Sequence, residues 1–300
     1  MDQAEKLRKM LKSQASEKRE TNAKVAKVIT VTSGKGGVGK SSLSVNLAIQ
    51  LSRMGKRVIV FDADIGLANI EIMLGVRPLY NLADLMYRGK NIKDIITYGP
   101  ENVGFISGGS GIHELSNLTK DQIYSLVHKL IELDQLADVI IVDTGAGISD
   151  MVLEFVAASE EILLVATPEP TSITDAYALL KTLNRKIRDR ADNTTVKLVA
   201  NQVNNESEAV ELYKKFGIVV DKFLDIGIEE LGSVPYDRDM QKAIMKQAPI
   251  SISIPNAKSA KAIGEIARKL ENIQEEPEHP IGMVRVFSRL IRLSLKKENK

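Results

Sequence analysis

Short runs of β-branched and other apolar residues alternate with longer stretches of helical periodicity along most of the chain. The clearest runs occupy residues 27–33, 57–64, 102–109, 138–144, 161–168, 196–203 and 230–237. Near-continuous Val and Ile runs are typical of strands that are covered on both faces. Because a helical pattern follows each run, we expect a three-layer α/β fold with a doubly wound, mostly parallel sheet.

Two stretches of different character flank this pattern. Residues 1–26 are polar with a weak apolar stripe, and residues 274–280 are rich in Glu and contain two prolines. A helix does not continue through such a proline-containing stretch. We therefore predict a tail over 1–26, one domain over 27–273, a linker over 274–280 and a separate segment over 281–300.

Composition narrows the class of protein. The 300 residues are 44% hydrophobic and 27% charged, which is ordinary for a globular protein, and none is cysteine. Disulfides, iron–sulfur ligation and thiolate zinc sites are thereby excluded. No run approaches the ~20 apolar residues of a membrane span, and the N-terminus lacks a secretory pattern, so we expect a cytoplasmic location.

The net charge of +2 hides an uneven distribution. Residues 1–27 carry eight Lys or Arg against four Asp or Glu, and residues 281–300 carry six against one. The rest of the chain is therefore acidic. This pattern indicates that the ends, rather than the body, meet an anionic surface or an acidic partner.

A glycine-rich loop connects the first predicted strand to the first predicted helix. It reads GKGGVGKS and fits the pattern G-x-x-x-x-G-K-[ST], in which backbone N–H groups and a helix N-terminus bind phosphates. We expect Lys40 to reach the β and γ phosphates of ATP and Ser41 to ligate Mg²⁺. The predicted nucleotide contacts are Gly34, Lys35, Gly36, Gly37, Val38, Gly39, Lys40, Ser41 and Ser42.

Three aspartates follow other buried runs. Asp143 ends the run over 138–144 and is expected to bind a water in the Mg²⁺ shell, although a strand-end aspartate can also be a helix cap. Asp64 is our candidate for orienting the attacking water and for touching the metal shell. Asp62 is expected to support the lysines of the loop or the metal shell, and a purely structural role stays open.

The motifs KGGVGKS, DADIGLAN and VDTGAG, in that order, resemble those of the deviant Walker A ATPases of the MinD/ParA group. The resemblance covers residues 27–272. It implies that Lys35 crosses the interface of an ATP-bound homodimer and contacts the phosphates of the other copy. Since Lys40 already serves the phosphates of its own chain, a second cation is suited to acting in trans, as an arginine finger does. A surface lysine in a mobile loop is the alternative.

The same resemblance concerns the base of the nucleotide. It implies that Asn201 hydrogen-bonds the adenine edge and that Pro235, Tyr236 and Asp237 lie near the base. Asparagine at a strand end also caps helices well, so that interpretation stays open. With no glutamine or arginine finger predicted beside the γ phosphate within the body, we expect slow, dimer-dependent ATP hydrolysis.

The C-terminal segment has one apolar and one basic side. Arg and Lys residues flank an apolar stripe, the pattern of an interfacial membrane helix whose weak binding is strengthened when a dimer presents two copies. The predicted membrane contacts are Ile281, Val284, Phe287, Leu290, Ile291 and Leu295. The alternative is a helix packed onto the domain or onto a partner.

The N-terminal DQAEKLR resembles the activator motif of the MinD-like regulators of flagellar number, FlhG, also called YlxH or FleN. The resemblance implies docking on the signal-recognition-type GTPase FlhF. A glutamine on a short helix is chemically suited to orienting water at a γ phosphate. The predicted partner contacts are Asp2, Gln3, Ala4, Leu7 and Arg8.

A second partner surface is expected on two neighbouring helices. Residues 172–190 and 206–217 should expose Lys181 and Phe216, together with Arg185 and Tyr213, to a flagellar switch-complex protein. A solvated helix face is the competing interpretation. The whole pattern predicts a Mg²⁺-ATP-dependent dimerising switch that binds the membrane reversibly and controls flagellar number or placement.

Other classes share the body of this sequence. A MinD-type regulator of cell division needs no 26-residue extension, and a ParA-type partitioning ATPase would prefer DNA to lipid, so nucleic acid is not favoured as a partner. A capsule-type tyrosine kinase would need a tyrosine cluster near its end, but no tyrosine follows Tyr236. An iron–sulfur carrier would need cysteines.

Overall fold

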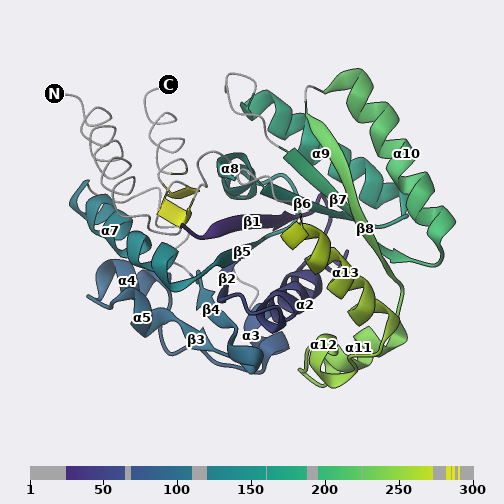
Figure 1. The fold of residues 1–300 in the computed structure, drawn as a ribbon. Coiled ribbons are helices and arrows are strands. Elements are labelled where there is room, and N and C mark those ends of the chain that lie inside the picture. The colour runs from purple at the N-terminus through teal and green to yellow at the C-terminus, as the bar shows by residue number, and fades with distance from the viewer. Residues whose placement is uncertain are drawn as a thin grey trace.

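The structure is a computed structural model that describes residues 25–64, 69–109, 120–159, 161–187, 195–224, 226–272, 282–284, 286, 287 and 290. Eight strands form one sheet in this part of the chain (Figure 1). They are β1 (Lys27–Thr32), β2 (Val58–Ala63), β3 (Thr97–Tyr98), β4 (Gly104–Ser107), β5 (Val139–Thr144), β6 (Glu161–Ala166), β7 (Thr195–Val203) and β8 (Gly227–Pro235).

Helices cover both faces of this sheet. They are α2 (Lys40–Arg53), α3 (Asn69–Leu74), α4 (Leu82–Tyr87), α5 (Ile92–Ile95), α7 (Lys120–Leu136), α8 (Asp150–Ala158), α9 (Pro170–Ile187), α10 (Glu206–Phe223), α11 (Arg238–Met245), α12 (Ile250–Ser253) and α13 (Lys258–Asn272), with a 3₁₀ turn η1 (Pro100–Asn102).

The strand order is β3-β4-β2-β5-β1-β6-β7-β8. Every neighbouring pair is parallel except β3 with β4, which is antiparallel. The prediction of a doubly wound, mostly parallel sheet is confirmed. The edge strand β3 was not predicted, because a strand of two residues leaves no periodic pattern in the sequence.

Successive residues of each strand pack into different layers, as the pleat requires. Ile29 and Val31 of β1 face the core beneath α2, α3 and α13, whereas Val28 faces the core shared with α4, α5, α7 and α8. The same second face continues under α9 and α10. Figure 1 shows these two helical layers on either side of the sheet.

Part of the C-terminal segment fills the core between α7 and α8. Met283, Val286 and Phe287 are fully buried, and Val284 and Leu290 nearly so. The Phe287 ring packs edge-on against Phe61 of β2, with ring centroids 5.8 Å apart, and against Phe155 of α8 at 6.1 Å.

A buried carboxylate holds the start of this segment. Asp134 of α7 is 1% exposed and accepts hydrogen bonds from the backbone N–H of Met283 at 2.6 Å and of Val284 at 3.4 Å. A Cβ on Gly282 would collide with the same carboxylate. The segment therefore approaches α7 closely enough to require glycine there.

The expectation of a detached, exposed apolar stripe is therefore wrong for Val284, Phe287 and Leu290. The physical reason is that Phe61 and Phe155 form an apolar surface that this stripe covers. Ile281, Ile291 and Leu295 lie outside the described residues. Among the helices that the structure describes, none is long and apolar enough to cross a membrane.

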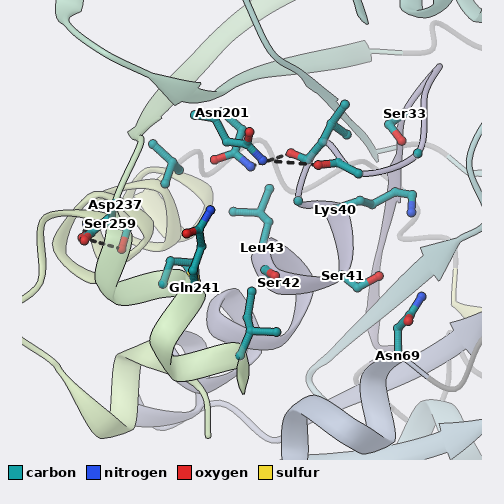
Figure 2. A pocket seen from close by; sticks show the side chains of 18 of the residues that line it. Ser33, Lys40, Ser41, Ser42, Leu43, Asn69, Asn201, Asp237, Gln241 and Ser259 are labelled. Carbon is teal, nitrogen blue, oxygen red and sulfur yellow. Dashed lines mark hydrogen bonds between the residues drawn. The ribbon is translucent and has the colours of Figure 1, made fainter. Parts of the chain in front are cut away.

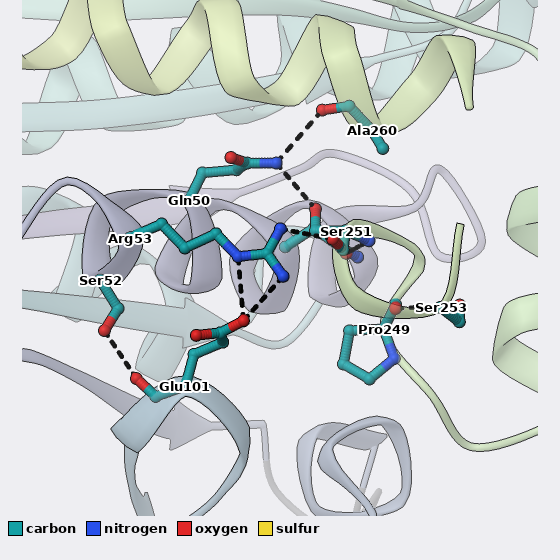
Figure 3. A network of polar contacts seen from close by, with 9 residues as sticks. Gln50, Ser52, Arg53, Glu101, Pro249, Ser251, Ser253 and Ala260 are labelled. Carbon is teal, nitrogen blue, oxygen red and sulfur yellow. Dashed lines mark hydrogen bonds and ion pairs between the residues drawn. The ribbon is translucent and has the colours of Figure 1, made fainter. Parts of the chain in front are cut away.

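A polar stripe on α2 fixes the position of α12 (Figure 3). Three α2 side chains, four and then three residues apart, bond the buried Ser251: Asn46 Oδ1 accepts from its N–H at 2.9 Å, Gln50 Nε2 donates to its Oγ at 3.2 Å, and Arg53 donates to its carbonyl at 2.6 Å. Arg53 also forms an ion pair with Glu101 of η1 at 2.7 Å. The helix that follows the glycine-rich loop, α2, is thus hydrogen-bonded to α12 and holds it in position.

We expect Asn46→Ala to lower the free energy of unfolding by about 1–3 kcal/mol, because the buried N–H of Ser251 and the carbonyl of Ser42 each lose a partner. Lys261→Ala, at an exposed position of α13, is the control and should stay within about 0.5 kcal/mol of wild type. Urea denaturation measures both. Equal stabilities of the two variants would contradict this role of the stripe.

Candidate nucleotide-binding site

The glycine-rich loop connects β1 to α2 with two glycines in left-handed conformation. Gly37 has φ of 78° and Gly39 has φ of 88°, and Gly39 is the N-cap of α2. A Cβ on Gly39 would also collide with the Asn201 side chain. Both constraints favour glycine at position 39, so the loop curls as a phosphate-binding loop does.

A cavity of about 670 Å³ opens beside this loop, a size within the usual range for small-molecule sites. In Figure 2, Lys40, Ser41 and Asn69 line one side, and Asp237, Ser259 and Gln241 line the other. Of the predicted residues, the cavity is lined by Lys35, Gly36, Gly37, Val38, Gly39, Lys40, Ser41, Ser42, Asp64, Asn201, Pro235, Tyr236 and Asp237. Gly34 lies at the base of the loop, where a Cβ would meet the backbone of Asp175 and Ala176.

Residues of β7 and of the loop after β5 bond carbonyls in and next to the phosphate loop. Asn201 Nδ2 donates to the Val38 carbonyl at 2.6 Å, and Gln202 Nε2 donates to the Gly37 carbonyl at 3.3 Å. On the opposite side, the Gly147 N–H donates to the Ser33 carbonyl at 2.9 Å. The loop after β5 is therefore bonded to the start of the phosphate loop.

Buried acidic groups lie behind Lys40. Asp62 and Asp143 are register partners on β2 and β5, are 5% and 0% exposed, and both interact electrostatically with Lys40. Burial raises the pKa of Asp62 to about 8, an effect strengthened by the charges of Asp143 and Asp64 and opposed by the Asp64 N–H and by Lys40. Burial also raises the pKa of Asp143, against the charge of Lys40 and the 2.7 Å hydrogen bond from Ser44.

The residues present fit a divalent cation that arrives with a nucleotide. Asp143 Oδ2 is buried and accepts no hydrogen bond from the described residues, so one oxygen of this carboxylate is left without a donor even though Lys40 lies beside it. The described part of the chain holds no cluster of three or more metal-ligating groups. Mg²⁺ typically binds one or two carboxylates together with substrate phosphates and keeps several waters. Ser41 and Asp64 line the cavity and could hold the ion, whereas Asp143 is fully buried, does not line the cavity and would reach the ion through a water. When bound, Mg²⁺ would neutralise charge on the phosphates.

Lys35 points toward the start of α9. Its ammonium forms an ion pair with Glu169 at 2.8 Å and a hydrogen bond with Thr171 Oγ1 at 2.9 Å, while its side chain stays 38% exposed. Lys40, in contrast, is buried among the aspartates. The two lysines of the loop therefore occupy different surroundings.

The far wall of the cavity is built around Asp237. Its Oδ2 accepts from the N–H and the Oγ of Ser259, at 3.1 and 3.0 Å, and its Oδ1 accepts from the Asp239 N–H at 2.9 Å. Burial alone would raise the pKa of this carboxyl, but these hydrogen bonds outweigh it and hold the pKa below its usual range. Asp237 thus joins β8 to α11 and α13, while the Tyr236 side chain remains 46% exposed.

The predicted partner surface on α9 and α10 is only partly correct. Lys181 and Arg185 are exposed, but Phe216 is 2% and Tyr213 is 9% exposed. Both rings belong to the apolar stripe with which α10 packs on β7 and β8, so the prediction that they are exposed is wrong. The N-terminal contacts Asp2, Gln3, Ala4, Leu7 and Arg8 lie outside the described residues.

Comparison with known proteins places this geometry in a family. A family model described as ParA, NUBPL iron-transfer P-loop NTPase, matches residues 24–271. The antiactivator FleN of Pseudomonas aeruginosa is 39% identical over 260 residues, which cover 87% of this chain and 91% of that protein. The chain belongs to the MinD/ParA family of P-loop ATPases.

A further relative supports this family, and a solved structure shows the same fold. The flagellum site-determining protein YlxH of Helicobacter pylori is 33% identical over 271 residues, which cover 89% of this chain and 90% of that protein. The septum site-determining protein MinD of Pyrococcus horikoshii, solved with Mg-ADP, has a TM-score of 0.63 at 21% identity and covers 82% of this chain and 96% of its own. Since this ATPase contains no cysteine, the thiolate ligands of iron–sulfur chemistry are missing.

Sequence reasoning missed part of the cavity wall of this ATPase. Met240, Gln241 and Ile244 of α11, Ser259 of α13 and Gln202 of β7 line the cavity but belong to no phosphate-binding motif. The spacing of the three α11 residues, on adjacent turns of one helix face, was the only available signal. Their partner across the cavity, the phosphate loop, lies about 200 residues away in sequence, so pattern alone could not bring them together.

Two substitutions should separate nucleotide binding from hydrolysis. We expect Lys40→Ala to weaken ATP binding at least tenfold, because a cation facing the phosphates is lost. Asp64→Asn should bind ATP nearly as wild type does and hydrolyse it at least tenfold more slowly. Calorimetric titration and a phosphate-release assay measure the two effects. Unchanged turnover in Asp64→Asn would remove this residue from the reaction.

Proposed function

We propose that this ATPase is a nucleotide-dependent dimerising switch that regulates flagellar number or placement. The observation that carries the proposal is the position of Lys35, which lines the nucleotide cavity while its ammonium is bonded away from the buried Lys40. The names of the FleN and YlxH relatives support the flagellar assignment.

The dimer would form through an exchange of partners at Lys35. In one copy Glu169 balances the charge of the ammonium and Thr171 Oγ1 accepts a hydrogen bond from it, both at the exposed start of α9. The phosphates of ATP in a second copy carry more negative charge than one carboxylate. They can accept hydrogen bonds from all three N–H groups of the Lys35 ammonium. ADP lacks the γ phosphate, so it would favour the exchange less, and hydrolysis would reset the switch.

Lys35→Ala should bind ATP but remain a monomer, because no cation then reaches the second nucleotide. Wild type should elute as a dimer with a non-hydrolysable ATP analogue and as a monomer with ADP in size-exclusion chromatography with light scattering. Lys214→Ala, an exposed lysine of α10, should dimerise normally. An ATP-dependent Lys35→Ala dimer with wild-type turnover would refute the exchange.

Membrane binding would require the C-terminal segment to leave its place in the core. Phe287 contacts Phe61, which directly precedes Asp62, and Phe155, which lies in the helix after the loop of Gly147. Asp64, which directly follows β2, and Ala146, in the loop before α8, both line the nucleotide cavity, so both contacts connect the segment to its surroundings. A nucleotide-dependent shift of these elements would therefore change how firmly the segment is held, and the basic residues around it would favour anionic lipid.

We expect Asp134→Ala to raise binding to anionic phospholipid vesicles about tenfold without nucleotide, because the N–H groups of Met283 and Val284 lose their acceptor. Flotation measures the bound fraction. Removal of residues 281–300 from the same variant is the control and should abolish binding. Binding that survives this removal, or an Asp134→Ala chain that binds like wild type, would contradict the proposal.

The N-terminal tail would stimulate a partner GTPase. A peptide of residues 1–22 should raise the GTP hydrolysis rate of the signal-recognition-type GTPase FlhF at least tenfold, because Gln3 can orient the attacking water. The same peptide with Gln3→Ala is the matched control and should raise it far less. Phosphate release with the two peptides measures the difference, and equal rates would remove Gln3 from this role.

A further inference from the structure

Two consecutive residues of β7 turn their side chains toward the phosphate loop. In a regular strand, neighbouring side chains point to opposite faces, so Asn201 and Gln202 would not both reach one loop. Here the pairing with β8 shifts register between Asn201 and Val203, and Gln202 has φ of 59°. This bulge brings both carboxamides to successive carbonyls of the loop.

The position of Gln202 is unusual for a residue with a side chain. Left-handed backbone is unfavourable for any residue with a Cβ, and glycine or asparagine adopt it more readily. The Gln202 side chain is exposed, so packing of its own side chain does not impose the conformation. Strained backbone beside a ligand cavity is a reason to look for function.

Each carboxamide bonds the carbonyl of one peptide unit in the loop and thereby sets the direction of the N–H group of the same unit. The described chain has no cis peptide bond, so the carbonyl of one residue and the N–H of the next point in opposite directions. The bond from Gln202 to the Gly37 carbonyl therefore aims the Val38 N–H away from β7. The bond from Asn201 to the Val38 carbonyl aims the Gly39 N–H in the same way.

We propose that Gln202 is a positioning residue that orients the Val38 N–H toward the β phosphate of a bound nucleotide, and that the left-handed bulge at Gln202 serves this purpose. The proposal rests on nucleotide binding in this cavity. Asn201 is nearly buried and its bond is short, whereas the Gln202 bond is longer and exposed. Gln202 is therefore the member of the pair that can be changed without opening the core.

A glycine at position 202 separates the role of the carboxamide, which bonds the loop, from the role of the left-handed backbone, which forms the bulge. Gln202→Gly removes the carboxamide and relieves the left-handed backbone, so we expect an unchanged or higher Tm but about three- to tenfold weaker binding of ADP and of a non-hydrolysable ATP analogue. In steady state, KM for ATP should rise while kcat stays near wild type. Gln202→Met, of similar length but without the donor, should lose the same affinity.

Gln247→Gly is the matched control. Gln247 is also a glutamine with left-handed backbone, at φ of 52°, and it lies after α11, where its N–H bonds the Ile244 carbonyl. This variant should change Tm in the same direction as Gln202→Gly and bind nucleotide like wild type. Scanning calorimetry and calorimetric titration of the full chain measure both quantities.

Wild-type affinity in Gln202→Gly would overturn the inference, since the bulge would then serve only the register with β8. A fall in Tm that accompanies the loss of affinity would overturn it too, because it would indicate a general structural role. If wild type itself bound neither nucleotide, nucleotide binding in this cavity would fail along with the inference.

Discussion

A phosphate-binding loop has to aim several backbone N–H groups inward, and the opposite ends of the same peptide planes then need donors. The rest of this structure is arranged around that constraint. Asn201 and Gln202 supply the donors from β7, and the Gly147 N–H supplies one from the loop after β5. The phosphate loop therefore depends on strands from both sides of β1, which only the parallel sheet brings together.

The helix that begins at the loop connects the phosphate site to α12, which packs against α11 and α13 of the far cavity wall. Lys40 starts α2 beside the buried Asp143, and Arg53 ends it in contact with Ser251 and Glu101. On the opposite face of the sheet, Phe287 packs on Phe61, one residue before Asp62. On one face of the sheet, α2 and α12 thus connect the nucleotide cavity to its far wall. On the other face, β2 and Phe61 connect it to the C-terminal segment.

Much of this could be predicted from the sequence, because strands covered on both faces are continuous apolar runs and the loop motif is locally complete. Positions that depend on distant neighbours could not. Phe216 has the periodicity of a core residue, but nothing in α10 alone says which sheet face it meets. The amphipathic stripe of Val284 and Phe287 suits a membrane surface as well as a protein core, and in the structure both residues are buried in the core. The bulge could not be predicted either, because its left-handed position is occupied by Gln202 and not by the glycine that usually marks such a conformation in a sequence.

The central claim is that the loop binds nucleotide phosphates and that the γ phosphate adds a second copy of the chain. Hydrogen exchange of the full wild-type chain with ADP and with a non-hydrolysable ATP analogue tests it most directly. We predict that backbone amides of residues 36–42 are protected by both nucleotides, and that amides around Lys35 and Glu169 gain protection only with the ATP analogue. Equal exchange of these amides with and without nucleotide would contradict the account.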